Sequence, residues 1–504
     1  LMGVSPWIWW ADVAPTRKAQ LYATAGKTEV GSPSVKFRGL FINDEDWGLK
    51  PWAAKKMDPS INQIGPNTYG RVMELLLRLR ANTLWPAMHA CSRAFWFEKT
   101  NIPLVRKYDI YMGSSHCEQR LRDNVYEWNK YGGHGDDDWN WATNQQMVKN
   151  YWADRVGESR GYNAIYTLGM RGVHDTGING YPSTADKVAG LTSILAYQRQ
   201  LITDSLGDPT TIPQIFIPYK EVMDAYNAGL KVPDDVTLMW VDDNHGYIRQ
   251  LPNATEQKRS GGHGIYYHLS YLGTPNSYLW LSTISPMLIS FELSNAYDQG
   301  IRDQWIINVG DIKPAEEEFE FCMDLAWDIN SWTPDRAHAY TRAWAARTFG
   351  EEYADEIAAI KEVYYRLGIA AKPEHLNNAH FDYSFRQMDE RISAYQDIYN
   401  RATTLRNQIP ATLRAAYYQL VEYPVKACAD QNIKMLRAHQ SLRLAWSGQR
   451  ETALAYASQA SKAYNEIQSM TTKYNTGIAS GKWEKMMSCS PNGSGFDMPT
   501  VAKT

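Results

Sequence analysis

The hydrophobic pattern from residue 36 to about residue 312 alternates between two kinds of segment. Short β-branched or aromatic runs predict strands, and apolar residues at three- and four-residue spacing predict amphipathic helices between several of them. The predicted strands are residues 36–43, 81–87, 109–113, 164–170, 212–219, 237–243, 264–270 and 304–309. The predicted helices include 69–80, 145–158, 185–206 and 284–299, and Ser183 is a suitable N-cap for the third.

Eight strand and helix units are typical of an α/β fold, and we expect residues 36–312 to form a catalytic (β/α)8 TIM barrel. The alternative is an open, doubly wound sheet. No G-x-G-x-x-G motif follows any predicted strand, and a count of eight favours closure into a barrel.

After about Pro314 the strand pattern stops, and residues 313–480 are predicted to form an all-α helical bundle. Its predicted helices are 316–329, 334–348, 351–367, 385–408, 411–447 and 451–472, and Pro424 should kink or divide the fifth. We expect residues 1–35 to be a lead-in segment and residues 481–504 a linker-like tail. Both ends suggest a fragment of a larger protein.

Composition and charge narrow the class of partner. The net charge is −3, from 52 basic and 55 acidic residues, so nucleic acid is not expected as a partner. No apolar run approaches the roughly 18 residues that span a bilayer, so no membrane role is expected. The chain has 19 Trp and 32 Tyr but 12 Phe, which suits either stacking on sugars or the packing of a large core.

The five cysteines, Cys91, Cys117, Cys322, Cys428 and Cys489, lie far apart in the sequence. None belongs to a C-x-x-C pair or stands at zinc-like spacing from a histidine. The sequence therefore predicts no metal site and no cofactor.

Carboxylates follow four of the predicted strands, where a barrel has its active site. Glycosidic cleavage needs one carboxylic acid to protonate the leaving oxygen and a second carboxylate to activate water or attack the anomeric carbon. Asp44, Asp175 and Glu221 could supply both groups. Capping of the following helices is the alternative role for each of them.

Arg171 is predicted to lie among these carboxylates. Its planar fork of donors matches the carboxylate of a uronic acid, which would make the substrate an acidic sugar. A counter-charge for Asp175 is the equally weighted alternative. Asn244 could bind a sugar hydroxyl or could form a turn.

Other side chains at the strand ends suit polyol recognition. Histidines at these positions could hydrogen-bond sugar hydroxyls, although each alone is more often structural. Trp240 is a candidate stacking ring, with core packing as its alternative role. The candidate binding residues of this kind are His89, His116, His174, His268, Glu45, Asp242, Asp243 and Trp240. The adjacent pair Asp242-Asp243 also permits a hexosaminidase interpretation, in which paired acids orient an attacking acetamide.

Several long motifs resemble glycoside hydrolase family 115, the xylan α-1,2-glucuronidases. They are FRGLFINDEDWGLKPWA, ANTLWPAMHA, MGSSHCEQRLRDNVYEW, YTLGMRGVHD, IPYKEV, MWVDDNHGYIR and GIYYHLSYLGTPNSYLWL. The resemblance implies an inverting reaction without a metal cofactor. It also implies a further N-terminal α/β domain and a C-terminal β-sandwich, and we expect this chain to lack both.

The resemblance also assigns roles to residues. The family's N-D-E motif falls on Asn43-Asp44-Glu45, its R-G-x-H-D on 171–175, its E-V on Glu221-Val222 and its D-D-N on 242–244. It makes Glu221 the general acid and Asp175 or Asp44 the general base, and it places Arg171 and Asn244 in substrate binding. The chain departs from the family pattern at Asp46-Trp47 and at His89-Ala-Cys-Ser.

We therefore expect an enzyme that removes α-1,2-linked (4-O-methyl-)glucuronic acid from glucuronoxylan or glucuronoxylo-oligosaccharides by inversion. A secreted or periplasmic location is expected, although the chain shows no signal peptide, and a homodimer is left open. The alternatives are a barrel β-N-acetylhexosaminidase and a non-catalytic sugar-binding fragment.

Overall fold

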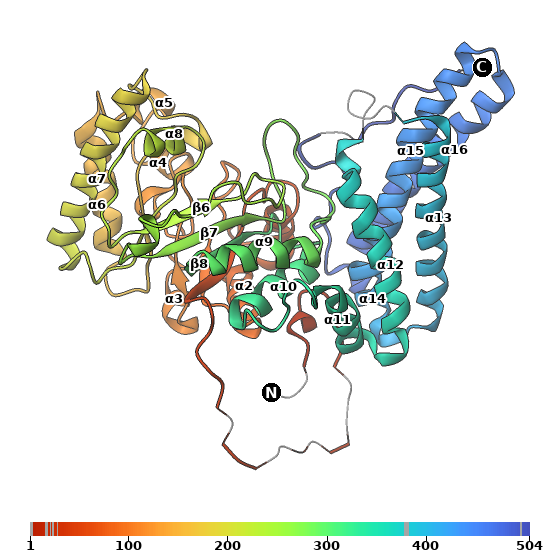
Figure 1. Ribbon diagram of the computed structural model, residues 1–504, viewed down its shortest axis with the longest axis horizontal. Helices are drawn as coiled ribbons and strands as arrows, with labels where there is room; N and C mark the ends of the chain where they lie inside the picture. The colour runs from red at the N-terminus through yellow and green to blue at the C-terminus, as the bar shows by residue number, and fades with distance from the viewer. Residues whose placement is uncertain are drawn as a thin grey trace.

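The computed structural model describes residues 4–15, 19–20, 22, 25–27, 29–376, 383–493 and 496–503. Within them, eight parallel strands curl into a half-barrel, and long helices make up the C-terminal part (Figure 1). The strands are β1 (Phe37–Phe41), β2 (Thr83–Trp85), β3 (Tyr111–Met112), β4 (Tyr166–Leu168), β5 (Gln214–Phe216), β6 (Thr237–Val241), β7 (His263–His268) and β8 (Ile301–Asn308). Each overlaps its predicted segment, so the eight predicted strands are confirmed.

The strand order is β3-β2-β1-β8-β7-β6-β5-β4, which places β3 and β4 at the two ends of the sheet. A single parallel bridge, Met112 to Ala164, links these ends. The Met112 amide donates to the Asn163 carbonyl and the Ile165 amide donates to the Met112 carbonyl, each at 2.9 Å. The two ends of the sheet are therefore joined by one short seam of hydrogen bonds.

Side chains alternate across the strands, and both faces are buried. Phe41, Met239 and Tyr266 belong to a small apolar cluster, whereas their chain neighbours Leu40 and Trp240 belong to the large cluster that includes the helices. Successive residues of a strand point to opposite faces. The small cluster therefore fills the inside of the curl, and Trp240 faces the helical layer outside it.

The helices confirm most of the predicted segments. Ser183 caps α7 in a capping box with Asp186, as a Ser three residues before an acidic residue favours. In the strand-containing part the helices are α1 (Leu49–Trp52), α2 (Pro66–Arg78), α3 (Pro103–Tyr108), α4 (Tyr126–Lys130), α5 (Gly135–Asp138), α6 (Gln145–Glu158), α7 (Thr184–Leu206), α8 (Glu221–Asn227) and α9 (Pro286–Asp298). The C-terminal helices are α10 (Glu316–Trp327), α11 (Tyr340–Phe349), α12 (Glu351–Ala370), α13 (Phe385–Gln408), α14 (Arg414–Tyr417), α15 (Tyr423–Trp446) and α16 (Arg450–Thr472).

Pro424 divides the long predicted helix in the expected way. A π-helical turn, Tyr418–Glu422, separates α14 from α15, and Pro424 occupies the second position of α15. Proline has no N–H to donate to the preceding turn, so a wider turn before it relieves the clash with that turn. The chain stays helical but changes its hydrogen-bond register.

A cluster of tryptophans joins both ends of the chain to the sheet-bearing part. Trp9, Trp10, Trp52 and Trp483 have ring centroids 5.1–6.1 Å apart. Trp483 and Phe496 are buried, which corrects the expected linker-like tail, because these residues pack against the body of the protein.

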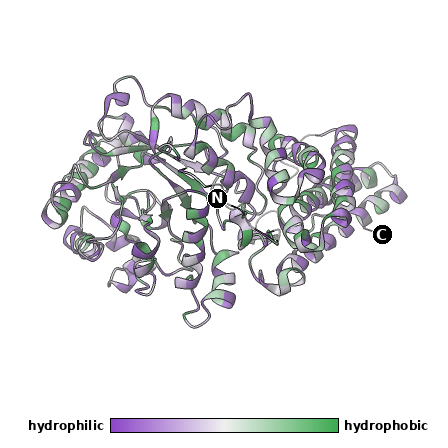
Figure 2. Ribbon diagram, turned by 90° about the horizontal axis from the view of Figure 1, so that it is seen from below, coloured by the Kyte–Doolittle hydropathy of each residue, from purple (hydrophilic) through white to green (hydrophobic). Residues whose placement is uncertain are grey.

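Figure 2 shows apolar residues concentrated on the strands and polar residues along the outer helical surfaces. Among the described helices, none has the length and apolar character needed to cross a bilayer.

Candidate active site

Several residues that follow the strands have an uncommon, left-handed backbone conformation. Asp44 follows β1, His174 and Asp175 follow β4, Lys220 follows β5 and Asn244 follows β6, and all five have φ between 50° and 76°. Left-handed φ is uncommon for residues other than glycine and costs on the order of 1–3 kcal/mol, so it persists where surrounding contacts impose it. The strand ends are therefore held in one arrangement by their contacts.

A cavity of about 190 Å³ opens among these strand ends. It is smaller than the roughly 300–1,000 Å³ of pockets for drug-sized ligands, which suits a single sugar unit better than an extended chain. Six predicted site residues line it: Asp44, His89, His116, His174, Asp175 and His268. Its other lining residues are Phe41, Asn43, Met88, Cys117, Tyr219, Tyr266, Tyr271 and Leu272.

Arg171 binds two of the three predicted catalytic carboxylates. Its Nε donates to Glu221 Oε1 at 2.9 Å, its Nη2 donates to Glu221 Oε2 at 2.7 Å, and its Nη1 contacts Asp175 Oδ1. The guanidinium is buried. Arg171 therefore serves as a shared counter-charge for Glu221 and Asp175, as in the counter-charge interpretation.

These contacts change the titration of Glu221. Burial alone would raise the pKa of Glu221, but the hydrogen bonds and charge of Arg171 lower it below its ordinary value of 4.5. Glu221 is thus ionised while Arg171 holds it. A general acid at this position needs its proton restored before it can act.

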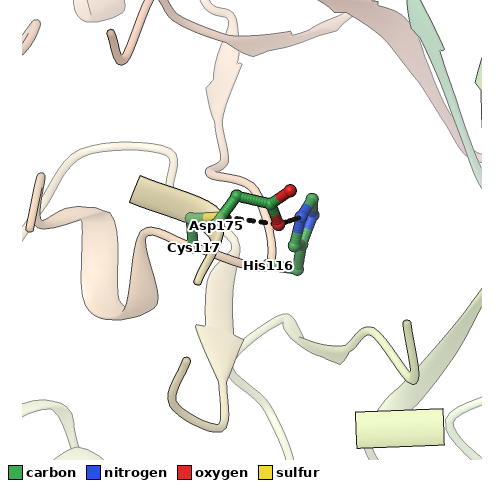
Figure 3. Close-up of side chains that lie close together, drawn as sticks. All are labelled: His116, Cys117 and Asp175. Atoms are coloured by element: carbon green, nitrogen blue, oxygen red, sulfur yellow. Dashed lines mark hydrogen bonds and ion pairs between the residues drawn. The ribbon is translucent and has the colours of Figure 1, made fainter. Parts of the chain in front are cut away.

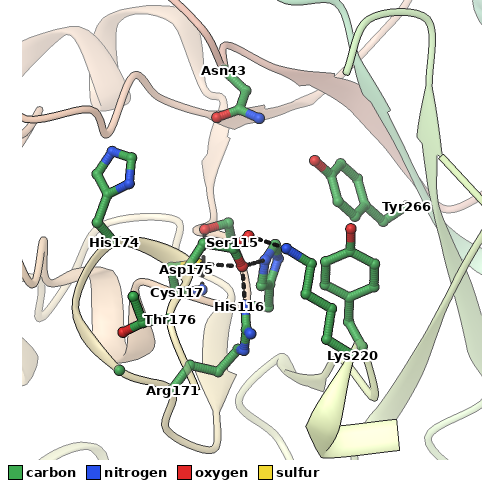
Figure 4. A network of polar contacts seen from close by, with 12 residues as sticks. Asn43, Ser115, His116, Cys117, Arg171, His174, Asp175, Thr176, Lys220 and Tyr266 are labelled. Atoms are coloured by element: carbon green, nitrogen blue, oxygen red, sulfur yellow. Dashed lines mark hydrogen bonds and ion pairs between the residues drawn. The ribbon is translucent and has the colours of Figure 1, made fainter. Parts of the chain in front are cut away.

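Asp175 is surrounded by donors (Figure 4). In addition to Arg171, Lys220 Nζ contacts its Oδ2, and His116 Nε2 lies 2.8 Å from its Oδ1. Burial, with help from Arg171 and Lys220, lowers the pKa of His116 well below 6.5, so His116 is neutral and donates from Nε2. Both Asp175 oxygens are engaged.

His116, Cys117 and Asp175 form a compact group (Figure 3), with Cys117 Sγ 3.5 Å from Asp175 Oδ1. One ligand atom from each lies within 4.8 Å of the others, as in a metal site. The Arg171 and Lys220 cations already contact Asp175, and they would repel a metal ion. This group is better suited to proton and hydrogen-bond chemistry.

Asp44 differs from Asp175 in having free lone pairs. It is 2 % exposed, and neither carboxylate oxygen has a hydrogen-bond partner among the described residues. Burial raises the pKa of Asp44 to about 7, with the His89 charge opposing the rise and Glu45 adding to it. Its Oδ1 lies 3.7 Å from His89 Nε2, beyond hydrogen-bond distance, so both oxygens remain available to hydrogen-bond a ligand in the cavity.

His89 connects the cavity to the acidic loop after β1. Its Nε2 lies 3.1 Å from Asn43 Oδ1, its Nδ1 contacts Asp46 Oδ2, and its backbone N–H donates to Glu45 Oε1 at 2.8 Å. Burial would lower the pKa of His89, but the negative charges of Glu45, Asp46 and Asp44 raise it to about 10. Glu45 is completely buried and does not line the cavity.

The remaining predicted residues lie behind or beside the cavity. Asp242 contacts His268 Nδ1 and accepts from the Gly246 amide, so it orients His268 from behind. Asn244 accepts from the Tyr219 hydroxyl at 2.9 Å and does not reach the lining. Asp243 pairs with Arg249 on the surface.

Trp240 does not reach the site. The ring is 0 % exposed, faces the helical layer, and donates from Nε1 to His263 Nδ1 at 3.2 Å. The stacking role predicted for it is corrected to core packing, because strand alternation turns it away from the inside of the curl.

Sequence reasoning missed several residues of the site. Lys220 contacts Asp175, and the Tyr219, Tyr266 and Tyr271 rings line the cavity. Tyr219 and Lys220 directly precede Glu221, so their position at the end of β5 was the available signal. The tyrosines supply the amphipathic rings that the composition had suggested.

Comparisons with known proteins identify the family of the chain. The family model "Glycosyl hydrolase family 115" matches residues 30–375. The structure of a family GH115 4-O-methyl-alpha-glucuronidase with specificity for decorated arabinogalactans is 42% identical, with a TM-score of 0.93, and the alignment covers 100% of this chain and 67% of that one. No curated protein matches the sequence.

A second similar structure is a GH138 enzyme targeting pectin rhamnogalacturonan II, at 12% identity and a TM-score of 0.55, covering 90% of this chain and 81% of that one. At this identity the likeness concerns the fold alone. The family model matches well over half of the chain, and the chain therefore belongs to glycosyl hydrolase family 115.

Proposed function

We propose that the chain is an α-glucuronidase that removes α-1,2-linked glucuronic acid, or its 4-O-methyl ether, from glucuronoxylan. The observation that carries this proposal is a cavity for one sugar unit in which β1, β4 and β5 supply Asp44, Asp175 and, beside them, the Arg171–Glu221 pair. Decorated arabinogalactan is the second candidate polysaccharide, because the 42%-identical structure has that specificity. Either polymer would be met outside the cytoplasm, in line with a secreted or periplasmic location.

Glu221 is the proposed general acid, and its contact with Arg171 explains how it could acquire a proton. A uronate carboxylate entering the cavity would compete with Glu221 for the Arg171 donors, since guanidinium forks bind carboxylates bidentately. Once Arg171 is shared, the burial of Glu221 favours its neutral form. Glu221 would then donate this proton to the glycosidic oxygen.

Asp44 is the proposed general base. Both of its oxygens are without a hydrogen-bond partner among the described residues, whereas Asp175 is engaged by Arg171, Lys220 and His116. In the strand order β1 lies four places from β5, and β4 is next to β5. If the seam between β3 and β4 completes a closed barrel, as we propose, Asp44 lies across the cavity from Glu221.

A position of Asp44 across the cavity from Glu221 favours a reaction that inverts the anomeric configuration. An inverting enzyme leaves room for water between the acid and the base, with roughly 6.5–9.5 Å between the carboxyl groups. Asp44 would activate this water on the sugar face opposite the leaving oxygen. Asp175, fixed by three donors, would position Arg171 rather than exchange a proton.

The two alternatives are a hexosaminidase and a non-catalytic sugar-binding fragment. Asp242 and Asp243 do not line the cavity and bind His268 and Arg249 instead, so they do not form the paired acids of a hexosaminidase. A non-catalytic sugar-binding role could use the same oxygens of Asp44 as acceptors, so the release of uronic acid is the result that separates it from catalysis.

Assays on glucuronoxylan and on glucuronic-acid-decorated arabinogalactan test the proposal. Release of free uronic acid from glucuronoxylan is the expected result, with Glu221→Gln as the inactive control. Release of uronic acid from arabinogalactan but not from glucuronoxylan would change the proposed substrate and leave the proposed α-glucuronidase activity intact. Release of N-acetylhexosamine, or binding of either polymer without any release, would overturn the proposal.

A further inference from the structure

A second cavity, of about 660 Å³, lies in the helical bundle and shares no lining residue with the active-site cavity. Helices α13 and α16 both pack against α15, and Figure 1 shows the three running alongside one another. Each presents one side to this cavity, which we call the bundle groove; on α16 these residues are Gln459, Lys462 and Glu466, three or four positions apart. Its volume is more than three times the 190 Å³ of the active-site cavity, so it has room for several sugar units.

A buried carboxyl group without a partner lines the bundle groove. Asp430 in α15 is 6 % exposed, and its Oδ2 has no hydrogen-bond partner among the described residues. Lys426 and Lys462 lie close enough to act on its charge, but neither forms an ion pair with it in the described part of the chain, and Lys426 pairs with Glu422 instead. A buried polar atom without a hydrogen bond costs free energy, which a ligand that supplies the bond would recover.

The rim of the bundle groove carries exposed polar side chains on both flanking helices. Ser393 and Gln396 lie on α13, and Gln459 lies on α16. A hydroxyl or a carboxamide can both donate and accept hydrogen bonds. These side chains can therefore bind a ligand that itself carries donors and acceptors along its edges.

Apolar surface lies between these polar groups. The half-buried ring of Tyr399 lines the groove together with Ile392 and Ile433. Sugar rings have apolar faces and hydroxyl edges, so aromatic and aliphatic surface flanked by hydrogen-bonding groups matches them.

The charges in the bundle groove favour a neutral ligand. Asp389, Asp430 and Glu466 oppose Arg437 and Lys462, and Asp389 accepts from Arg437 at 2.6 Å. An anion would meet the carboxyl groups of Asp430 and Glu466. A cation would meet Lys462 and an Asp430 whose pKa burial raises to about 8, which favours its neutral form at pH 7. A neutral polyol can donate to the carboxyl groups and accept from Lys462 and the glutamines.

We propose that the bundle groove is a second carbohydrate site, which binds an undecorated, neutral segment of the polysaccharide backbone. Asp430 exchanges a hydrogen bond with a sugar hydroxyl, Gln396 and Gln459 bind hydroxyls from the two sides, and Tyr399 packs against a ring. Binding here keeps the polymer attached between encounters with the active-site cavity, which raises the local concentration of side chains to be cleaved. The site rests on membership of a glycoside hydrolase family and not on the proposed α-glucuronidase specificity.

The test is a ligand-observed NMR titration of the full chain with xylohexaose and with a galactan hexasaccharide, neutral segments of the two candidate polysaccharides. Neither carries uronic acid, so the proposed reaction does not consume them. The expected result is saturable binding of at least one of them. Asp430→Ala, and Gln396→Ala combined with Gln459→Ala, should each weaken it about tenfold, as expected for one or two lost hydrogen bonds.

Gln468→Ala is the matched control. Gln468 is an exposed glutamine of α16 that lies nine residues after Gln459, about two and a half turns, and so on the opposite side of the helix. This variant should bind the hexasaccharide as the wild type does. If Asp430→Ala does not fold, the two exposed glutamines decide the question.

Binding that survives in both groove variants, or that is lost in Gln468→Ala, would overturn the assignment. Absence of saturable binding of either hexasaccharide, or displacement of the bound one by glucuronate, would overturn it as well. Tighter binding of putrescine or of a galacturonic acid hexamer would make the groove a site for charged ligands and refute a neutral one. Because the titration needs no turnover, a lack of α-glucuronidase activity would refute the proposed function without affecting this result.

Discussion

Arg171 holds the Glu221 carboxylate in a two-pronged ion pair, with hydrogen bonds of 2.9 Å from Nε and 2.7 Å from Nη2. This pair would put the proposed acid, Glu221, in direct competition with the carboxylate of the substrate for the donors of Arg171. A substrate carboxylate that binds Arg171, as we propose, would take donors from Glu221. Recognition of the uronic acid and activation of the acid would then be the same event.

Glu221→Gln should lower kcat on glucuronoxylan by about 10²–10⁴-fold, because the amide cannot protonate the sugar leaving group. An aryl glucuronide with a good leaving group needs less proton donation and should recover much of the lost rate. Steady-state kinetics on both substrates provide the measurement. Equal losses on the two substrates would remove Glu221 from the role of acid.

Arg171→Ala should mainly weaken binding of the uronide. The lost charge-assisted contact is worth about 1.5–3 kcal/mol, or roughly 10- to 150-fold in affinity. The variant should also lose preference for an aryl glucuronide over the matching neutral glucoside. Inhibition constants for glucuronate and glucose give the comparison, and an unchanged ratio would exclude Arg171 as the carboxylate anchor.

Binding of glucuronate should be coupled to proton uptake. The pKa of Glu221 lies below 4.5 while Arg171 holds it, and burial should raise it once the ligand shares Arg171. Between these two values binding takes up a proton, so glucuronate should bind more tightly as pH falls through this window.

Calorimetry in two buffers of different ionisation enthalpy measures this uptake directly. Wild-type protein should take up close to one proton per glucuronate, and Glu221→Gln should take up almost none. Glucose, which has no carboxylate, serves as the control ligand. Uptake that persists in Glu221→Gln would place the proton on another group.

The first product released from an α-linked substrate should be the β-anomer of glucuronic acid. Asp44 is proposed to deliver water from the face opposite Glu221, which inverts the anomeric centre. Proton NMR during the first minutes of turnover distinguishes the anomers before they equilibrate. Initial formation of the α-anomer would indicate retention and contradict the assigned base.

Gly39→Ala should strongly destabilise the fold. A Cβ at Gly39 in β1 would lie 1.7 Å from the Thr83 carbonyl oxygen of β2, so the two strands would have to separate. Overpacking of this kind costs roughly 1–3 kcal/mol or more. Thermal unfolding measures the effect, and Gly157→Ala in α6, where a Cβ meets no atom within 4 Å, is the matched control.

Gly157→Ala should be neutral or slightly stabilising, because alanine is favoured over glycine in helices by about 1 kcal/mol. Similar melting temperatures for Gly39→Ala and the wild type would show that β1 and β2 can move apart at little cost.

The local hydrophobic pattern of the sequence was sufficient to predict most of the helices and strands. The helices predicted at 145–158 and 385–408 have the bounds of α6 and α13, because their apolar spacing is regular and Ser384 caps the second. Trp240 shows what this local pattern cannot predict. Alternation along β6 predicts that neighbouring residues face opposite ways, but it does not say which face lies inside the curl.

The site depended on contacts between distant segments. Arg171 and Glu221 are separated by 50 residues, and the sequence left Arg171 with two equal roles. Only the adjacency of β4 and β5 brings these two side chains together. The pairing of His89 with Asp46 likewise depends on the neighbouring loops after β1 and β2, and no spacing rule connects them.

The bridge between Met112 and Ala164 is the shortest connection between neighbouring strands of the sheet, so the sheet is not equally well held together all the way round. Every other pair of neighbouring strands shares at least two registered positions, whereas β3 and β4 share this one. Directly beyond it, the hydrogen bond between His116 and Asp175 spans the same gap from opposite sides. Thermal fluctuations of the sheet should therefore be largest between β3 and β4. A fluctuation that opens this seam would break the His116 contact with Asp175 first and leave the Arg171 and Lys220 contacts in place, while Asp44, just after the more extensively paired β1, would be less affected.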